Sequence, residues 1–134
     1  ACFQQLKERV NTIPMALLLA QSIRATQWGQ ANYVTAGNNY FAQPCFSQGC
    51  GIKAKHSSID LEYKRYPSVY AGVAEHVLYL NTAPQFESLR QLRAKLQPHV
   101  TAMALLPGIA ASQASGAQYA TELKKTILQF KLEQ

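Results

Sequence analysis

The segment "IPMALLLAQSIRATQWG", residues 13–29, decides the architecture that this chain can adopt. We expect Thr12 to cap a helix that has Pro14 in its first turn and ends near Gly29, because these residue types favour those positions. Apolar side chains recur at helical spacing on a face that includes Met15, Leu17, Leu18, Leu19, Ala20 and Ile23. Since its first half is apolar almost all the way round, we expect this helix to lie at the centre of the fold.

Composition sets the broad class. The 134 residues suit a single domain, 1–134, and the 48% hydrophobic content is ample for one core. The net charge of +6 favours an acidic partner such as nucleic acid, anionic lipid or an anionic wall polymer, or it serves solubility alone. No apolar run reaches 18 residues, so no transmembrane helix is expected. The start "ACFQQLKERV" has no basic-then-apolar leader, which indicates a mature product or an excised domain.

Cysteines and histidines give few signs of chemistry. Cys45 and Cys50 flank the turn-rich "FSQG", and a bridge between them would indicate an oxidising compartment, whereas two free thiols are the alternative. Cys2 is left over, either free or paired between chains. No group of Cys or His has ligand spacing, so we expect no metal and no cofactor. The basic residues are spread over several helices without a recognition motif, so nucleic-acid binding is not expected.

A small irregular lobe, at about residues 38–66, interrupts the helices. In "SSIDLEYKRY", residues 57–66, Ile59, Leu61 and Tyr63 alternate with polar residues, which predicts a short strand in a hairpin. Helices are expected to follow, the first capped by Ser68, with the apolar face Val69, Val73, His76, Val77 and Leu80. The fold class is therefore α+β, mostly α.

The remaining helices are delimited by prolines and glycines. Pro84 should open a helix that Pro98 stops, and a helix within residues 101–114 should break at Pro107 and Gly108. In the helix after Pro84 we expect Phe86, Leu89, Leu92 and Leu96 to face inward and Arg90, Arg93 and Lys95 to face outward. The last helix should bury Tyr119, Leu123, Ile127 and Phe130.

Three stretches together resemble the bacterial glucosaminidase family of peptidoglycan hydrolases (mannosyl-glycoprotein endo-beta-N-acetylglucosaminidase-like), in particular its Bax-type branch. They are "LAQSIRATQWG" (19–29), "GNNYFAQPCFSQGCGI" (37–52) and "YKRYPSVYAGVAEHVLYLNTAPQFESLRQLR" (63–93). The Gly-Asn-Asn-x-Phe motif followed by the Cys-Phe-x-x-Gly-Cys loop is the most specific part. The resemblance covers nearly the whole chain, from about Val10 to about Leu132. It implies a lysozyme-like fold with a small β-hairpin lobe and a glycan groove, and cleavage of the glycosidic bond after N-acetylglucosamine.

Glycoside hydrolysis requires a carboxylic acid that protonates the leaving oxygen, and its pKa must be raised by partial desolvation. The family places this glutamate on the long helix, three residues before the tryptophan, where the present chain has Ala25. A methyl group has no proton to give. A second carboxylate usually comes from the β lobe, where Asp60 and Glu62 are the candidates, or simply two solvated strand residues.

The resemblance also implies a glycan-binding surface. Its candidate residues are Gln21, Trp28, Asn39, Tyr40 and Phe41. Each also has a purely structural interpretation, as core packing for the aromatic residues or as a turn for the asparagines.

Further departures accompany Ala25. Gln27 and Ala42 stand where glycine is common in the family, and Ser112 stands at a tyrosine that helps line the glycan site. An engineered knock-out would explain Ala25 alone, whereas four changes together favour natural drift after activity was lost.

Three functions remain open from the sequence. The first is a catalytically inactive domain, periplasmic or otherwise extracytoplasmic, that binds peptidoglycan or an envelope protein. The second is a peptidoglycan N-acetylglucosaminidase whose glutamate has been replaced by Ala25. The third is an active hydrolase that uses another acid, such as Glu62. Whether the chain is an enzyme is thus undecided at this stage.

Overall fold

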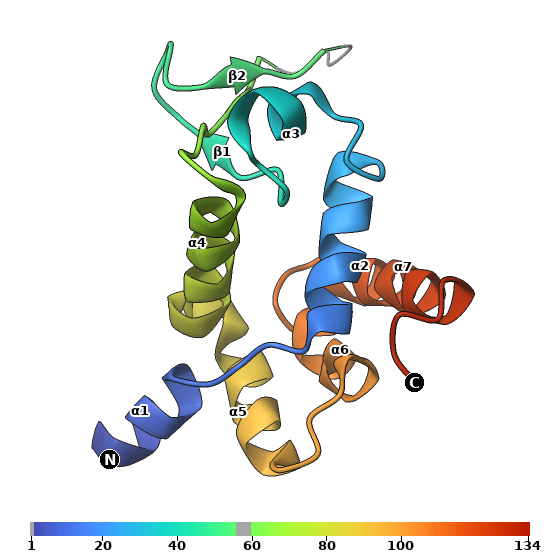
Figure 1. Cartoon of the computed structure of the whole chain (residues 1–134). Helices are drawn as coiled ribbons and strands as arrows, with labels where there is room; N and C mark the ends of the chain where they lie inside the picture. Colours follow the sequence, from blue (N-terminus) through green and yellow to red (C-terminus); the bar gives the residue numbers. More distant parts are fainter. Residues whose placement is uncertain (1, 56–59) are drawn as a thin grey trace. The chain divides into compact units, whose positions relative to one another are not determined.

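A computed structural model describes residues 2–55 and 60–134 and divides into two compact units. The first comprises Ala1–Ala20 and Val77–Gln134, and the second comprises Gln21–His76. Two helices, α2 (Met15–Thr26) and α4 (Val69–Thr82), run from one unit into the other (Figure 1). The second unit is larger than the lobe expected at residues 38–66, since it takes in the end of α2 and the start of α4.

The first unit is entirely helical in its described part. Besides its shares of α2 and α4 it contains α1 (Cys2–Arg9), the short 3-10 helix η1 (Pro84–Phe86), α5 (Glu87–Leu96), α6 (Ala102–Ala110) and α7 (Gly116–Gln129). Helix α6 packs against both α5 and α7, and α1 packs against α5. Among the described helices, none combines the length and apolar character that crossing a bilayer requires.

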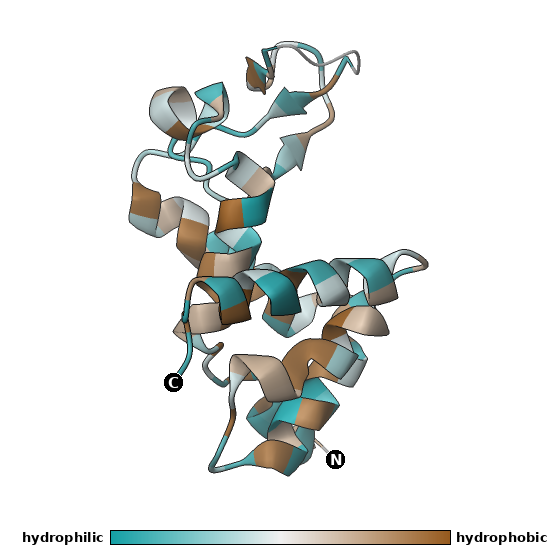
Figure 2. Ribbon diagram, turned by 90° about the vertical axis from the view of Figure 1, so that its right-hand side faces the viewer, coloured by the Kyte–Doolittle hydropathy of each residue, from teal (hydrophilic) through white to brown (hydrophobic). Residues whose placement is uncertain are grey.

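The core of the first unit is built from aliphatic side chains. Hydrophobic (brown) and hydrophilic (teal) residues alternate along these helices in Figure 2. Its members are almost fully buried: Leu17, Leu80, Leu89, Leu105, Ile109, Leu123 and Ile127. Burial of each such side chain contributes about 1.5–3 kcal/mol. Helices α5 and α6 approach so closely that a Cβ on Gly108 would lie 2.5 Å from the Cα of Leu89. Glycine is therefore required at that crossing.

Two arginines of α5 are buried, so the expectation that they face outward was wrong. Arg90 is 4% exposed and donates from Nη1 to the carbonyl oxygens of Leu80 (3.0 Å) and Ala83 (2.9 Å), near the end of α4. Arg93 is 1% exposed and donates to the Glu8 carbonyl near the end of α1 and to Asn81 Oδ1 at 2.7 Å. Carbonyls at helix ends lack partners within the helix, and these guanidinium groups supply them.

Helix boundaries differ from expectation at two places. Helix α2 begins at Met15 rather than after Thr12, and the carbonyl of Pro14 accepts its first hydrogen bond, from the Leu17 amide. Helix α6 continues through Pro107 without a break and ends three residues later. One missing amide donor near the end of a helix is tolerated there, because Thr101 caps the start of α6 and the Pro107 carbonyl still accepts from Ala111.

Two amphipathic faces are also shifted. In α4 the buried residues are Gly72, His76 and Leu80, whereas Val69 is 45% exposed. Ser68 caps this helix as expected, since its hydroxyl accepts from the Ala71 amide. In α7, Leu123 and Ile127 are buried as expected, but Tyr119 is half-buried and Phe130 is 43% exposed.

The second unit surrounds a small three-stranded antiparallel sheet instead of a simple hairpin. The strands are β1 (Pro44–Cys45), β2 (Ile52–Lys53) and β3 (Glu62–Tyr63), in the order β1-β3-β2. Tyr63 lies opposite Pro44 on one side and Ile52 on the other. The strand expected around Leu61 and Tyr63 is thus present at its C-terminal end, while Ile59 lies outside the described residues.

A short helix, α3 (Asn32–Gly37), packs against the sheet to form the core of the second unit. Tyr33, Val34 and Ile52 are its buried centre, and the rings of Tyr33 and Tyr63 stack with their centroids 4.3 Å apart. This aromatic pair ties α3 to the central strand.

Candidate functional site

The C-terminal turn of α2 carries Ala25, the position at which the sequence resemblance predicts an acid. The helix ends at Thr26, and the next three residues, Gln27, Trp28 and Gly29, all have positive φ, at 51°, 63° and 77°. The Trp28 amide donates to the Ile23 carbonyl at 3.1 Å, which is the 6→1 bond of a Schellman ending. Gln27 therefore occupies the left-handed position that glycine normally fills.

The backbone at Ala25 is held firmly although its side chain is only a methyl group. The Tyr33 hydroxyl donates to the Ala25 carbonyl at 2.7 Å. Burial and the nearby Tyr63 raise the pKa of that hydroxyl, so it remains a proton donor at any physiological pH. The Thr26 hydroxyl donates to the Ser22 carbonyl at 2.7 Å and accepts from the Gly29 amide at 2.9 Å. The frame for a side chain at position 25 is therefore complete.

Gln21, one turn before Ala25, is engaged inside the unit. It is 4% exposed, and its Oε1 lies 3.0 Å from Nε2 of His76. The His76 ring stacks on Phe41, with centroids 3.9 Å apart and planes at 6°. Burial lowers the pKa of His76 to about 4, so the ring is neutral near pH 7. A neutral ring that donates to an amide oxygen carries its proton on Nε2.

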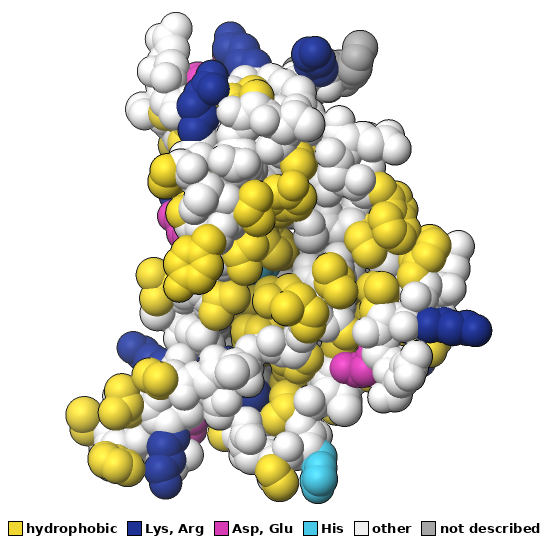
Figure 3. Space-filling model, viewed as in Figure 1, with side chains coloured by type: hydrophobic (Ala, Val, Ile, Leu, Met, Phe, Trp, Pro, Cys, Tyr) yellow, Lys and Arg dark blue, Asp and Glu magenta, His cyan; other side chains and the backbone are white. Residues whose placement is uncertain are grey.

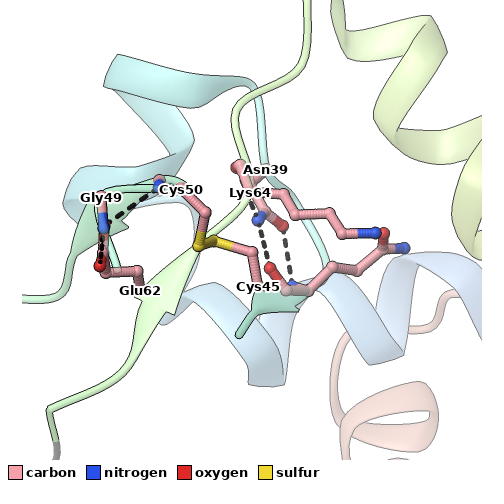
Figure 4. Close-up of a disulfide and its surroundings, with 8 residues drawn as sticks. Asn39, Cys45, Gly49, Cys50, Glu62 and Lys64 are labelled. Carbon is pink, nitrogen blue, oxygen red and sulfur yellow. Dashed lines mark hydrogen bonds between the residues drawn. A yellow bond between two sulfur atoms is a disulfide. The ribbon is translucent and has the colours of Figure 1, made fainter. Parts of the chain in front are cut away.

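Asn39 has a similar internal role, and Figure 4 shows its amide between two backbone segments. The side chain is fully buried. Its Nδ2 donates to the carbonyls of Gln43 and Lys64, both at 3.0 Å, and its Oδ1 accepts from the Gln43 amide at 3.0 Å. Every hydrogen-bonding atom of the Asn39 amide therefore has at least one partner in the unit.

The other three glycan-binding candidates are accessible to solvent. Trp28 is 56% exposed, and Tyr40 and Phe41 are half-buried. Of the five residues selected from the sequence, these three have side chains that solvent reaches, whereas Gln21 and Asn39 are buried.

The disulfide Cys45–Cys50 is present, with the two Cα atoms 6.1 Å apart, and Cys2 is free and exposed (Figure 4). Glu62 on β3 fastens the loop that this bridge closes. Its carboxylate accepts from the amides of Gly49 at 2.8 Å and Gly51 at 3.0 Å, and these two hydrogen bonds hold the pKa of Glu62 below its usual value. Glu62 is therefore a carboxylate that organises the loop.

Two other acidic residues complete the second unit. The Asp60 side chain is 87% exposed and pairs with Lys53 at 3.4 Å. Glu75, which sequence patterns did not single out, pairs with Lys64 at 2.7 Å and accepts from the Tyr66 hydroxyl. Burial raises the pKa of Glu75, but the hydrogen bonds from Lys64 and Tyr66 outweigh it and hold that pKa below its usual value. Its lysine partner lies eleven residues away, too far for a local sequence signal.

Within the described residues, no three His, Cys, Asp or Glu side chains gather as a metal site would require. Several apolar side chains of the first unit are exposed, and those of α1 are visible as yellow spheres at the lower left of Figure 3.

The chain belongs to the glucosaminidase family, described as mannosyl-glycoprotein endo-beta-N-acetylglucosaminidase, which it matches over residues 1–132. It is 29% identical to Protein bax of Escherichia coli (strain K12) over 118 residues, which are 85% of this chain and 42% of that protein. The chain thus spans less than half the length of that relative.

Among solved structures, the chain is similar to a C-terminally truncated glycoside hydrolase domain from Salmonella typhimurium FlgJ. The TM-score is 0.65 at 18% identity, over 96% of this chain and 91% of that one. This similarity confirms the expected fold class, a mostly helical α+β fold of lysozyme-like type with a small β lobe.

Proposed function

We propose that this chain is a catalytically inactive glucosaminidase-family domain that binds glycan strands of peptidoglycan without cutting them. The observation that carries the proposal is the end of α2, where hydrogen bonds from Tyr33 and Thr26 keep the frame of the site around a residue that is only Ala25. Membership of this family supports a place in the bacterial envelope, and we propose a periplasmic or otherwise extracytoplasmic location.

The acidic residues of the second unit support the loss of activity. A general acid must hold a proton near neutral pH, which requires a carboxyl group whose pKa is raised by desolvation. Glu62 and Glu75 instead accept hydrogen bonds that favour their charged forms. Asp60 lies in solvent beside Lys53. This disfavours the alternative in which Glu62 replaces the missing acid.

Accessible aromatic side chains support the binding role. Trp28, Tyr40 and Phe41 are exposed or half-buried, and flat aromatic faces suit the apolar faces of sugar rings. Trp28 lies two residues after the end of α2, and its position there does not depend on the side chain at position 25.

A second candidate function is a peptidoglycan N-acetylglucosaminidase that is inactive here only because alanine stands for glutamate at position 25. The hydrogen bonds around Ala25 favour this second function, because they would fix the backbone position of a glutamate at residue 25. The other three departures, Gln27, Ala42 and Ser112, favour drift instead.

Two assays on purified sacculi test the proposal. The chain should sediment with sacculi and release no reducing sugar ends, and Trp28→Ala should weaken sedimentation. Ala25→Glu should remain inactive in zymograms if the site has drifted. Clearing by Ala25→Glu would show that one substitution accounts for the inactivity and would support the enzyme alternative.

Further controls separate the remaining outcomes. Clearing by the unchanged chain, abolished by Glu62→Gln, would overturn the proposal in favour of an active hydrolase. A chain that neither clears nor sediments would contradict glycan binding and leave an envelope protein as the partner. Gln48→Ala, on the exposed disulfide loop, is a matched surface control that should sediment like the unchanged chain.

A further inference from the structure

A hollow of about 530 Å³ lies in the second unit, between the loop that follows α2, helix α3 and the end of β2. Its volume falls within the range of about 300–1,000 Å³ that is usual for small-molecule sites. Polar side chains line it, among them Gln27, Gln30, Asn32 and Lys55, beside the stacked rings of Tyr33 and Tyr63. None of its lining residues carries a carboxylate.

The polar side chains at the hollow differ in their hydrogen bonding. The Asn32 amide donates to the Lys53 carbonyl at 2.8 Å and accepts from the Lys55 amide at 3.2 Å, so it fixes the end of β2. The side-chain amides of Gln27 and Gln30, by contrast, make no hydrogen bond within residues 2–55 and 60–134, and both residues are exposed. Each therefore offers a donor and an acceptor at the hollow.

Gln27 carries an additional signal. Its φ of 51° lies in the left-handed region, where a residue with a Cβ is disfavoured and glycine is not. The Gln27 side chain makes no hydrogen bond within the described residues. The left-handed ending of α2 therefore places Gln27 where its side chain lines the hollow.

We propose that this hollow binds an acetamido sugar of a glycan strand, with Gln27 and Gln30 as its hydrogen-bonding residues. Carboxamides pair with an acetamido group through one donor and one acceptor, and the hydroxyl-bearing rings of Tyr33 and Tyr63 add an apolar wall. The lack of lining carboxylates suits a neutral or anionic ligand. The choice of an amino sugar rests on the proposed function, whereas the residues differ from Trp28, Tyr40 and Phe41.

The test is a titration of the full 134-residue chain with chitotetraose, followed by amide chemical shifts and calorimetry. Shifts should include residues 27–35 and 54–55. Gln27→Gly and Gln30→Ala should each weaken binding roughly 3- to 10-fold, the effect of one lost hydrogen bond. Gln27→Gly should at the same time raise the melting temperature, by about 2–6 °C, because glycine relieves the strain.

Matched variants separate binding from folding. Ala42→Gly relieves the same kind of strain, at φ 52°, at a residue that does not line the hollow, and should leave affinity unchanged. Gln48→Ala removes an exposed glutamine that does not line this hollow and should also bind normally. Cellotetraose, which lacks acetamido groups, should bind at least 10-fold more weakly.

Several results would overturn the inference. They are unchanged affinity in both Gln27→Gly and Gln30→Ala, equal affinity for cellotetraose, or shifts confined to residues outside the hollow. If the Trp28→Ala variant no longer sediments with sacculi but chitotetraose still shifts the amide signals at the hollow, the hollow binds sugar independently of Trp28, Tyr40 and Phe41. If sedimentation is normal and the hollow shows no shifts, the proposed function stands and this inference fails.

Discussion

The two units of this molecule are held together in different ways. The first relies on aliphatic side chains from several helices, such as Leu105 and Leu123, which are completely buried. The second has a much smaller apolar core around Tyr33 and Ile52, and depends on side chains that bond to backbone, such as Asn39.

This difference locates where sequence change is tolerated. Apolar packing is non-directional, so a helical unit absorbs conservative replacements with modest loss. A lobe fixed by individual hydrogen bonds depends on particular atoms, and one substitution leaves buried groups unpaired. The Ala25 side chain takes no part in the hydrogen bonds at the end of α2, which use its carbonyl oxygen and the Thr26 hydroxyl, so this position can change without unpairing a buried group.

The largest expected effect concerns the helical unit. Leu105→Ala should lower the free energy of unfolding by about 3–4 kcal/mol, because it leaves a cavity at a fully buried position. Urea denaturation measures the loss. Leu128→Ala, on the exposed side of α7, is the control and should change stability little. A loss below about 1 kcal/mol for Leu105→Ala would contradict a tightly packed first unit.

The second effect is a pH dependence of the small lobe. The pKa of His76 is lowered to about 4 in the folded state, so the unfolded chain binds the proton more readily. Above about pH 6.5 His76 is neutral in both states, so the free energy of unfolding is not reduced by its titration. As pH falls towards 4, the unfolded chain takes up the proton first, and the free energy of unfolding falls by at most about 3 kcal/mol. His76→Gln should flatten stability between pH 7 and 4. The same slope in both proteins would show that another group titrates.

The disulfide should matter less, and only locally. Cys45→Ser with Cys50→Ser should cost about 2 kcal/mol, because the bridge closes a short loop. Amide exchange should accelerate around Gly49 and Gly51, whose amides bond to Glu62, and remain unchanged in α6 and α7. Equal acceleration in both units would contradict the distinction between them.

The smallest effect is a gain in stability. Ala42 has φ 52°, so Ala42→Gly should stabilise the lobe by about 0.5–1 kcal/mol as the relief of strain exceeds the added freedom of the unfolded chain. Thermal unfolding measures it. Ala36→Gly, in the regular helix α3, should instead destabilise by a similar amount and is the matched control.

Sequence patterns predicted the helices well where apolar periodicity was long, as in α2, α4 and α7. They missed α1 and α3, because eight and six residues give too little periodic signal. The sheet was underestimated, since strands of two residues carry no alternation that can be recognised. Arg90 and Arg93 were misplaced because a charged residue is buried only when tertiary partners are available, which no local pattern shows.

The candidate site followed the same rule. The cysteine pair could be located from its motif, and the structure contains the bridge at Cys45–Cys50, whereas the role of position 25 stays a prediction. The engagement of Gln21 with His76, 55 residues away, could not. Polar side chains that bind a ligand cannot be told from polar side chains that stabilise the lobe by residue type alone. They are distinguished by the hydrogen-bond partners that the structure shows.

The buried arginines of α5 have one more consequence. They donate hydrogen bonds to carbonyl oxygens at the C-terminal ends of α4 and α1, which is a structural role. A pattern built on the Leu-Arg-x-Leu-Arg stretch at residues 89–93 therefore detects whether a chain can close its helix ends. A match to such a pattern is therefore evidence for the fold and not for hydrolase activity.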